Sequence, residues 1–335
     1  MKILCVGYHN PNFVNTTVYR EKAVRDLGHK TVEFDDRGFF LPGRLRDRFV
    51  FFQEWDLNRL NKRLMNCVDA ETPDICLIVG GHHILPDTVR YINGKNIITV
   101  LWTTDSPWYF DNVLKAAPAY KHIFCAGTEA IEIFEREGIK GAAWLPFACD
   151  PDYHKPAGLC ASEKARYGKD VVSVGSFYPN RAEIMEKISD FDIGVWGPYW
   201  DRIGAFSPLR GKVTDVKINY SEWVKIYSAA RVVLVLHYDD KKTPCYQASP
   251  KLYEAMACGA FVISDNQRDV KNLFENGKHL VIFNSVEDLR EKLKFYIANE
   301  DQRAAIAMAG YKEVLEKHTY KDRIRVILDK TGIDR

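Results

Sequence analysis

Short apolar runs rich in valine and isoleucine recur along the chain, separated by longer segments with helix-compatible patterns. Within each run the apolar residues follow one another almost without interruption, whereas a sheet with one exposed face would show strict alternation. Such runs predict strands covered on both faces, and therefore parallel sheets with helices packed outside. The predicted strands span residues 2–7, 31–35, 75–80, 97–102, 122–127 and a weaker 142–147 in the first half, and 170–176, 192–197, 232–238, 260–264 and 280–284 in the second.

Eleven such strands are too many for one comfortable sheet, and their spacing breaks between residues 150 and 168. The chain there is polar and contains Pro156 and Gly158, which predicts a linker followed by a short helix. A length of 335 residues suits two domains of ordinary size. We therefore expect an α/β fold of two doubly wound domains that face each other across a cleft, with residues 1–155 in the first and 165–317 in the second.

Composition narrows the class of protein. Hydrophobic residues make up 46% of the chain and charged residues 27%, a balance typical of a soluble globular protein. The net charge of +2 gives no reason to expect nucleic acid as a partner, and no apolar stretch is long enough for a transmembrane helix. The apolar run at the N-terminus is too short for a signal peptide, and the eight cysteines form no C-x-x-C pair, so we expect a cytoplasmic location.

Residues 249–259 predict a short helix that could bind an anion. Ser249 suits the N-cap, Pro250 the first helical position and Gly259 the position after the helix end. Lys251 in the first turn would complement a phosphate at the helix N-terminus. Glu254 lies on the same side, where its carboxylate could accept hydrogen bonds from the two hydroxyls of a ribose. Spacing alone leaves a second interpretation open, in which this is an ordinary capped helix with a surface lysine–glutamate pair.

Three stretches of the second half carry a resemblance to a known family. They are "SVGSFYPNR", "VWGPYW" and "SPKLYEAMACGAFVIS". Over roughly residues 170–328 the chain resembles the C-terminal half of GT-B glycosyltransferases and is most similar to the CgeB/YkvP spore-protein group. The resemblance implies two facing Rossmann-like domains, with a helix at about 318–335 that crosses back to the first. It also implies a nucleotide diphosphate-sugar donor, with a UDP-sugar favoured, held mainly by the second domain without a required cofactor or metal.

The resemblance assigns donor contacts by position. Glu254 would bind the ribose, and Arg181 would reach the diphosphate with Gly175 and Ser176 allowing close approach. Trp196 and Gly197 would lie near the base. Tyr238, with His237 and Asp239 beside it, follows a predicted strand and is expected near the donor. The donor-side residues are therefore Gly175, Ser176, Arg181, Trp196, Gly197, Tyr238, Ser249, Lys251 and Glu254.

One position departs from the larger family. Many retaining GT-B enzymes have a second glutamate eight residues before the ribose-binding one, and this chain has Tyr246 there. No acidic residue nearby replaces it, so the resemblance does not carry over a retaining mechanism. This departure keeps open two alternatives on the same fold, a nucleotide-sugar epimerase or hydrolase, and a non-catalytic surface or binding protein.

The candidates for the catalytic base follow strands of the first half. Asp105 lies after a strand between Trp102 and Trp108, which suits a base for an acceptor hydroxyl or a sugar platform. His82, His83 and His9 also follow strands, at the sheet edge where ligands of such folds bind. The alternative interpretation is a self-capping turn for Asp105 and polar surface for the three histidines.

Two further motifs need an interpretation. Asp150 and Asp152 form a D-x-D pair, which we interpret as a turn in the linker because no helper ligand lies at metal spacing, so no metal site is expected. The run of residues 37–49 contains Arg37, Arg44, Arg46 and Arg48 among aromatic residues. It could hold an anionic acceptor or touch a membrane surface, although such runs are more often solvated loops.

The sequence therefore predicts a GT-B glycosyltransferase that moves a sugar from a nucleotide diphosphate donor to an acceptor hydroxyl without a metal. The helix start at Ser249–Lys251 and Arg181 would stabilise the leaving diphosphate. The class of acceptor, the stereochemical outcome and the oligomeric state stay open.

Overall fold

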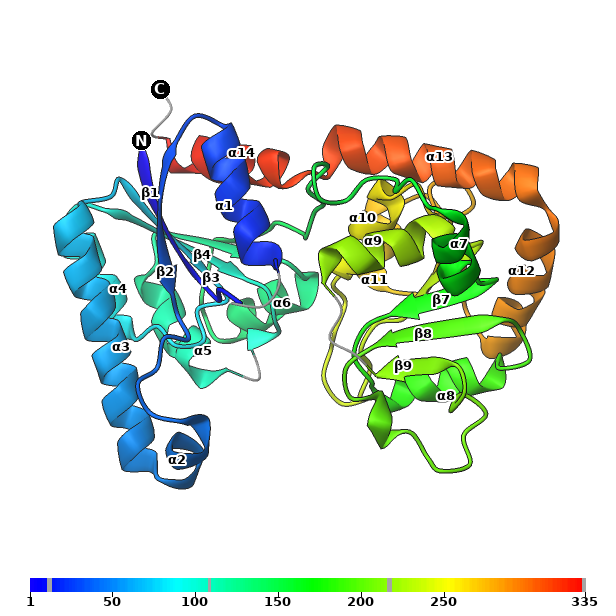
Figure 1. The fold of residues 1–335 in the computed structure, drawn as a ribbon. Helices are drawn as coiled ribbons and strands as arrows, with labels where there is room; N and C mark the ends of the chain where they lie inside the picture. Colours follow the sequence, from blue (N-terminus) through cyan, green and yellow to red (C-terminus); the bar gives the residue numbers. More distant parts are fainter. Residues whose placement is uncertain (11–13, 108–109, 216–218, 333–335) are drawn as a thin grey trace. The chain divides into compact units, whose positions relative to one another are not determined.

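The computed structural model of the chain describes residues 1–10, 14–107, 110–215 and 219–332. It divides into two compact units, the first formed by Met1–Pro146 with Tyr320–Arg335 and the second by Phe147–Thr319 (Figure 1). Each unit is built around its own six-stranded sheet, and all strand pairs within both sheets are parallel.

The sheet of the first unit has the strand order β2-β1-β3-β4-β5-β6. Its strands are β1 (Lys2–Gly7), β2 (Lys30–Asp35), β3 (Ile75–Val79), β4 (Ile98–Thr103), β5 (His122–Cys125) and β6 (Ala142–Trp144). The helices are α1 (Thr16–Asp26), α2 (Gly43–Arg48), α3 (Val50–Glu71), α4 (Pro86–Gly94), α5 (Asp111–Ala116), the 3-10 turn η2 (Ala117–Ala119), α6 (Thr128–Arg136) and α14 (Tyr320–Thr331).

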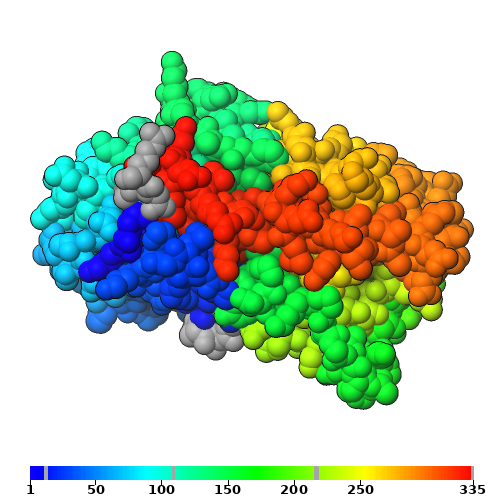
Figure 2. All heavy atoms as spheres, turned by 90° about the horizontal axis from the view of Figure 1, so that it is seen from above, coloured from blue at the N-terminus to red at the C-terminus, as the bar shows by residue number. Residues whose placement is uncertain are grey.

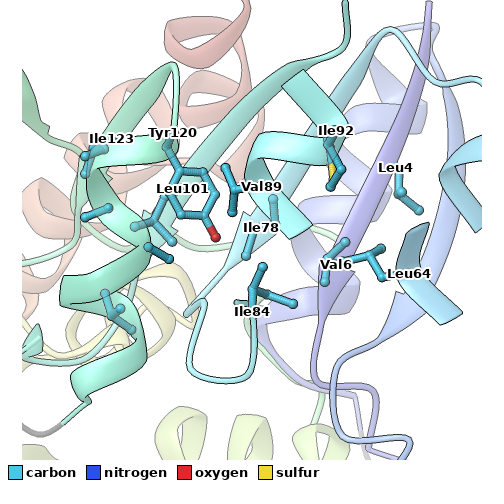
Figure 3. Packing of buried hydrophobic residues seen from close by; sticks show 14 of the residues in the cluster. Leu4, Val6, Leu64, Ile78, Ile84, Val89, Ile92, Leu101, Tyr120 and Ile123 are labelled. Atoms are coloured by element: carbon cyan, nitrogen blue, oxygen red, sulfur yellow. The ribbon is translucent and has the colours of Figure 1, made fainter. Parts of the chain in front are cut away.

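One apolar core of the first unit lies between the sheet and the helices α3, α4, α5 and α6 (Figure 3). Leu4 and Ile78 point from the sheet toward Leu64 of α3 and Val89 of α4, and all four side chains are fully buried. The continuous apolar runs of these strands follow from burial on both faces, because helices also cover the opposite side.

The last helix of the chain, α14, belongs to the first unit and packs against α1 (Figure 2). Lys321 forms an ion pair with Asp26 of α1 at 3.2 Å. The Arg20 guanidinium lies 4.2 Å from the ring centroid of Trp102 and 5.3 Å from that of Tyr320, so it joins α1, β4 and α14.

The sheet of the second unit has the order β12-β11-β10-β7-β8-β9. Its strands are β7 (Val171–Val174), β8 (Ile193–Gly197), β9 (Val213–Asp215), β10 (Val232–Val235), β11 (Val262–Asp265) and β12 (Val281–Phe283). The helices are α7 (Ala161–Tyr167), α8 (Pro179–Lys187), the 3-10 turn η3 (Trp200–Arg202), α9 (Tyr220–Ala229), α10 (Pro250–Ala257), α11 (Arg268–Leu273), α12 (Val286–Ala298) and α13 (Glu300–Lys317).

The predicted fold class is confirmed, and each of the eleven predicted strands is present with its bounds shifted by a few residues at most. The strand β9 was missed. It spans only three residues at the edge of the sheet, where a short segment need not carry a continuous apolar run. Within the described ranges, no helix is both long and apolar enough to cross a membrane.

Candidate functional site

The loops that follow β7 and β8 touch through two glycines. The Gly175 N–H donates to the Trp196 carbonyl at 2.8 Å, and the Trp200 indole N–H donates to the Gly175 carbonyl at 2.8 Å. Gly197 has a φ of +151°, and a Cβ built on it would lie 2.1 Å from the Gly175 oxygen. Both the backbone conformation and the close approach therefore require glycine at position 197.

Gly197→Ala is expected to lower the free energy of unfolding by about 3 kcal/mol or more, because the added methyl meets backbone and the φ value is strained. Gly204→Ala is the matched control, since a Cβ at that position has no atom within 4 Å and its φ is not in the positive range. Urea unfolding of both variants measures the difference, and equal stabilities would contradict the close contact between the two loops.

Arg181 and Lys251 converge on Gly175 from two different helices. A Cβ on Gly175 would lie 2.8 Å from Lys251 Cε and 3.0 Å from Arg181 Nη1. Arg181, in α8, is buried, and its guanidinium donates to the carbonyls of Ser176 and Leu236, the latter at 2.8 Å. Lys251 lies in the first turn of α10. Two cationic groups thus meet where β7 and β10 end.

The pairing of these two cations is incomplete in the part of the chain that the structure describes, where neither Arg181 nor Lys251 forms an ion pair with a carboxylate within 4 Å. Burial lowers the pKa of both groups, and the positive charge of Arg181 lowers that of Lys251 further. Arg181 is buried and Lys251 is half-buried, and two positive charges this close repel each other. The site therefore favours an anion, and a diphosphate carries the complementary charge.

Glu254 lies one turn after Lys251 in α10 and is only 8% exposed. Its carboxylate accepts no hydrogen bond from the described residues and pairs with no cation within 4 Å. Burial raises the pKa of Glu254 to about 7, although the nearby Lys251 opposes the shift. Because a buried acceptor without a partner is costly, hydroxyl groups of a ligand would be strongly favoured at this carboxylate.

The N-terminus of α10 is fixed by a chain of hydrogen bonds. Asp265, at the end of β11, lies 2.5 Å from His237 Nδ1, and His237 Nε2 accepts the Ser249 backbone N–H at 3.0 Å. Since Nε2 is an acceptor, the proton of this imidazole is on Nδ1 and points to Asp265. Burial alone would raise the pKa of Asp265, but the interaction and hydrogen bonds with His237 lower it overall.

This arrangement corrects one prediction. Ser249 occupies the N-cap position of α10, but its hydroxyl makes no capping hydrogen bond. Its backbone N–H is used instead, and His237 is the group that receives it. The sequence placed His237 near the donor but gave no role to Asp265. Asp265 directly follows the predicted strand 260–264, and the rule that ligands bind at strand ends could have identified it.

The remaining predicted donor residues lie in different surroundings. Tyr238 packs edge-on against Tyr178 with 4.9 Å between ring centroids, and Tyr178 in turn faces the Arg181 guanidinium at 5.1 Å. Trp196 is buried inside the unit and packs against Tyr167 at 6.2 Å. A role of Trp196 beside the base of a nucleotide stays a prediction.

In the first unit, Asp105 and His82 lie side by side after β4 and β3. His82 Nε2 is 3.4 Å from Asp105 Oδ2, and the imidazole stacks on Phe110 with 3.7 Å between centroids. Burial lowers the pKa of His82, while the Asp105 carboxylate opposes this shift. The side chain of Asp105 is 53% exposed, so its carboxylate is accessible to a ligand. A neutral histidine lies beside it. Trp108, predicted to flank Asp105, lies outside the described residues.

His83 lies next to this pair and near a buried carboxylate that the sequence did not single out. His83 Nδ1 is 3.9 Å from Asp36 Oδ2, and Asp36 directly follows β2. Four polar atoms here are buried and have no hydrogen-bond partner among the described residues: Asp36 Oδ1, His82 Nε2, His83 Nδ1 and the Tyr120 hydroxyl. Such a concentration marks a place where a polar ligand gains hydrogen bonds. Asp36 could also have been found from its position at a strand end.

His9 lies in a different environment from the other two histidines. Its Nε2 is 2.6 Å from Glu21 Oε1, and its Nδ1 is 3.1 Å from the Gly7 carbonyl. The hydrogen bond to Glu21 raises the pKa of His9, although burial opposes it. Both ring nitrogens therefore face acceptors, which favours the protonated imidazole and leaves no lone pair for a base.

His9 also belongs to the one group in the described ranges with the spacing of metal ligands. Ligand atoms of His9, Glu21 and Glu33 lie within 4.8 Å of one another. Glu33, however, forms an ion pair with Arg25 at 3.0 Å, and a protonated His9 cannot bind a metal. We interpret the group as an ion-pair cluster. In the D-x-D pair, Asp150 Oδ1 accepts the Asp152 backbone N–H at 2.9 Å, as in a turn.

Comparisons with known proteins show which family and which fold this chain resembles. A family model described as "Glycosyl transferase-like" matches residues 181–329. The spore protein CgeB of Bacillus subtilis (strain 168) is 23% identical over 268 residues, which cover 76% of this chain and 82% of that protein.

Three solved structures match nearly the whole chain and share its fold. HepE from Anabaena, in complex with UDP-glucose, has a TM-score of 0.69 at 12% identity and covers 99% of both chains. A glycosyltransferase from Rickettsia africae has a TM-score of 0.68 at 14% identity, covering 98% of this chain and 97% of its own. Sucrose-phosphate synthase from Thermosynechococcus elongatus has a TM-score of 0.68 at 11% identity, covering 100% of both chains. The resemblance drawn from the sequence is thereby confirmed: the chain has the GT-B fold, most of its second unit matches a glycosyl transferase-like family model, and the chain is similar to CgeB.

Proposed function

We propose that this protein transfers a sugar from a nucleoside diphosphate-sugar to an acceptor hydroxyl. The observation that carries the proposal is the grouping of Arg181, Lys251 and Glu254 in the second unit. Among the described residues, buried Arg181 and half-buried Lys251 form no ion pair, and the buried Glu254 carboxylate one turn further along the helix accepts no hydrogen bond. The cations match a diphosphate, and Glu254 matches the two hydroxyls of a ribose.

The same residues account for stabilisation of the leaving group. As the bond between sugar and diphosphate breaks, negative charge grows on the phosphate oxygens. Arg181, Lys251 and the positive end of the α10 dipole would stabilise that charge, and the Asp265–His237–Ser249 chain would hold the helix start in place. We assign charge neutralisation to these groups, so the proposed reaction needs no metal. UDP-sugars are the favoured donors because HepE, which shares the fold, was crystallised with UDP-glucose.

We assign the base to the first unit. Asp105 is the exposed member of the Asp105–His82 pair and would take the proton of the acceptor hydroxyl as the new glycosidic bond forms. His82, kept neutral by burial, would orient the carboxylate and share the proton. His83 and Asp36 lie beside this pair and would contact the hydroxyl groups of the acceptor.

Calorimetry with a panel of UDP-, GDP- and TDP-sugars tests the donor assignment. Binding of a sugar nucleotide by the wild type is expected, and no binding of any member would contradict the proposal. Incubation with the bound donor alone then separates the reaction types. An epimerised sugar, or rapid release of nucleotide without an acceptor, would favour the epimerase or hydrolase that the missing second glutamate at Tyr246 keeps open.

The affinity for UDP-glucose is expected to depend on pH in a bell-shaped way. Glu254 must be ionised to accept ribose hydroxyls, and its pKa is raised to about 7, so affinity falls below that pH. Lys251 must be protonated to bind phosphate, and its pKa is lowered to about 8, so affinity falls above that pH. Each limb approaches about tenfold per pH unit. Calorimetry with Glu254→Gln provides the control, because this variant should lose the acidic limb and keep the alkaline one.

A further inference from the structure

The first unit exposes a dense group of large apolar side chains around α2 and the start of α3. Phe51 is 72% exposed, Val50 68% and Phe40 65%, unusual values for side chains of this size. In α3 no residue before Asp56 is buried, and none is buried in α2. These turns extend away from the sheet of their unit (Figure 1). We call this surface the aromatic–arginine patch; its apolar members are Phe40, Leu45, Phe49, Val50, Phe51, Phe52 and Trp55.

The patch has a local positive charge that the whole chain does not show. Residues 37–63 contain seven arginines and lysines against three acidic residues, while the whole chain carries a net charge of only +2. One of the three acids, Asp56, is fully buried and faces Arg46 and Arg59. The other two acids, Asp47 and Glu54, are exposed, so the segment keeps an excess of positive charge that they offset only in part.

Arginine and aromatic side chains alternate in space as well as in sequence. The Arg46 guanidinium lies 3.8 Å from the Phe39 ring centroid, and Arg59 lies 4.9 Å from that of Phe40. Arg48 lies 5.5 Å from the ring of Phe49. Cations set beside exposed rings can bind phosphate groups while the rings enter an apolar phase, the arrangement found in helices that lie on a membrane surface.

The patch is also held in shape. Asp56 Oδ2 accepts the Leu41 N–H at 2.9 Å, and its Oδ1 accepts the Phe40 N–H at 2.9 Å. The buried carboxylate thus fastens the loop before α2 to the side of α3. A solvated, mobile loop would not be held by two hydrogen bonds to a buried carboxylate. Residues 37–49 therefore do not have the structure expected of such a loop.

We propose that the aromatic–arginine patch binds the surface of a membrane that contains anionic phospholipids. The apolar side chains would enter the boundary between headgroups and acyl chains, and Arg44 and Arg48, both exposed, would contact the phosphates. An apolar surface with a cationic rim matches this partner in both polarity and charge. The inference stands on the patch alone and does not depend on the proposed sugar transfer.

Co-sedimentation of the full chain with vesicles tests the proposal. Binding is expected to vesicles of phosphatidylcholine mixed with phosphatidylglycerol, to be weaker with phosphatidylcholine alone, and to fall as salt rises from about 0.1 M to about 0.5 M. Phe51→Ser with Trp55→Ser is expected to lower the affinity for mixed vesicles about tenfold or more. Both side chains are exposed, so the fold is expected to survive.

Matched variants separate the patch from general effects. Phe206→Ser, which alters a fully exposed phenylalanine of the second unit, is expected to leave binding unchanged. Arg44→Glu with Arg48→Glu is expected to lower the affinity about tenfold, whereas Lys140→Glu with Lys164→Glu, the same charge change at exposed positions elsewhere, is expected to have little effect. The proposal is overturned if mixed vesicles bind no protein, as for a patch that contacts only another protein, or if the patch variants bind as well as the wild type.

Discussion

Replacing Glu254 by alanine is expected to weaken the binding of UDP-glucose by about 30- to 1,000-fold. Two hydrogen bonds from ribose hydroxyls to a buried carboxylate are worth about 2–4 kcal/mol together. Glu254 is 8% exposed and has no partner of its own among the described residues, so the ligand would gain these bonds in full. Titration calorimetry of the wild type and Glu254→Ala measures the loss. Glu291→Ala, on an exposed face of the same unit, is the control and should bind normally.

Thermal unfolding distinguishes this role from a structural one. Because the pKa of Glu254 is raised to about 7 in the folded state from 4.5, the stability it contributes is present below pH 4.5 and is lost as the pH rises through 7. The Glu254→Gln variant cannot ionise at this position, so it does not lose this stability as the pH rises. Its Tm should therefore equal that of the wild type in acid and exceed it at pH about 8. A lower Tm for Glu254→Gln near neutral pH would indicate that the carboxylate supports the fold instead.

Asp105→Asn is expected to lower the turnover of UDP-glucose by about 10²–10⁴-fold, the usual contribution of a general base. The amide keeps the shape of the side chain but cannot take a proton from a hydroxyl. The affinity for UDP is expected to stay unchanged, because the residues assigned to the donor lie in the second unit. The rate of UDP release from UDP-glucose gives kcat for the wild type and for Asp105→Asn. It is measured first without an acceptor, where water takes the sugar, and then with any acceptor that raises the rate.

Asp111→Asn serves as the control for the base, since Asp111 is an exposed carboxylate at the start of α5 in the same unit. It should keep the wild-type rate. His82→Ala is expected to reduce kcat less than Asp105→Asn and to shift the pH at which the rate rises, because it removes the neutral neighbour of the base. Full activity of Asp105→Asn would remove the residue from the mechanism.

Most of the fold could be predicted from the sequence because burial on both faces imposes a continuous apolar run on each strand. The donor group could be predicted because Lys251 and Glu254 lie in one helix, so their spacing already places them on one side. The approach of Arg181 to Lys251 could not be derived from spacing. It depends on how β7 and β10 pair, and the family resemblance supplied Arg181 instead.

Contacts between distant segments account for what the sequence did not reveal. The hydrogen-bonded chain of Asp265, His237 and Ser249 forms because β11 lies beside β10. No local sequence pattern indicates that these two strands are neighbours. Asp36 meets His83 for a similar reason, since β2 and β3 flank β1 on opposite sides. The aromatic–arginine patch was visible as a run of residues, but only the anchoring of its loop by Asp56 separates it from a solvated segment.

A crystal structure with UDP bound would show directly whether the donor occupies the proposed site. We predict that both ribose hydroxyls lie within hydrogen-bonding distance of the Glu254 carboxylate. The diphosphate should lie against Arg181, Lys251 and the N-terminus of α10, close to Gly175. A nucleotide bound elsewhere, or one whose ribose does not contact Glu254, would contradict the donor site.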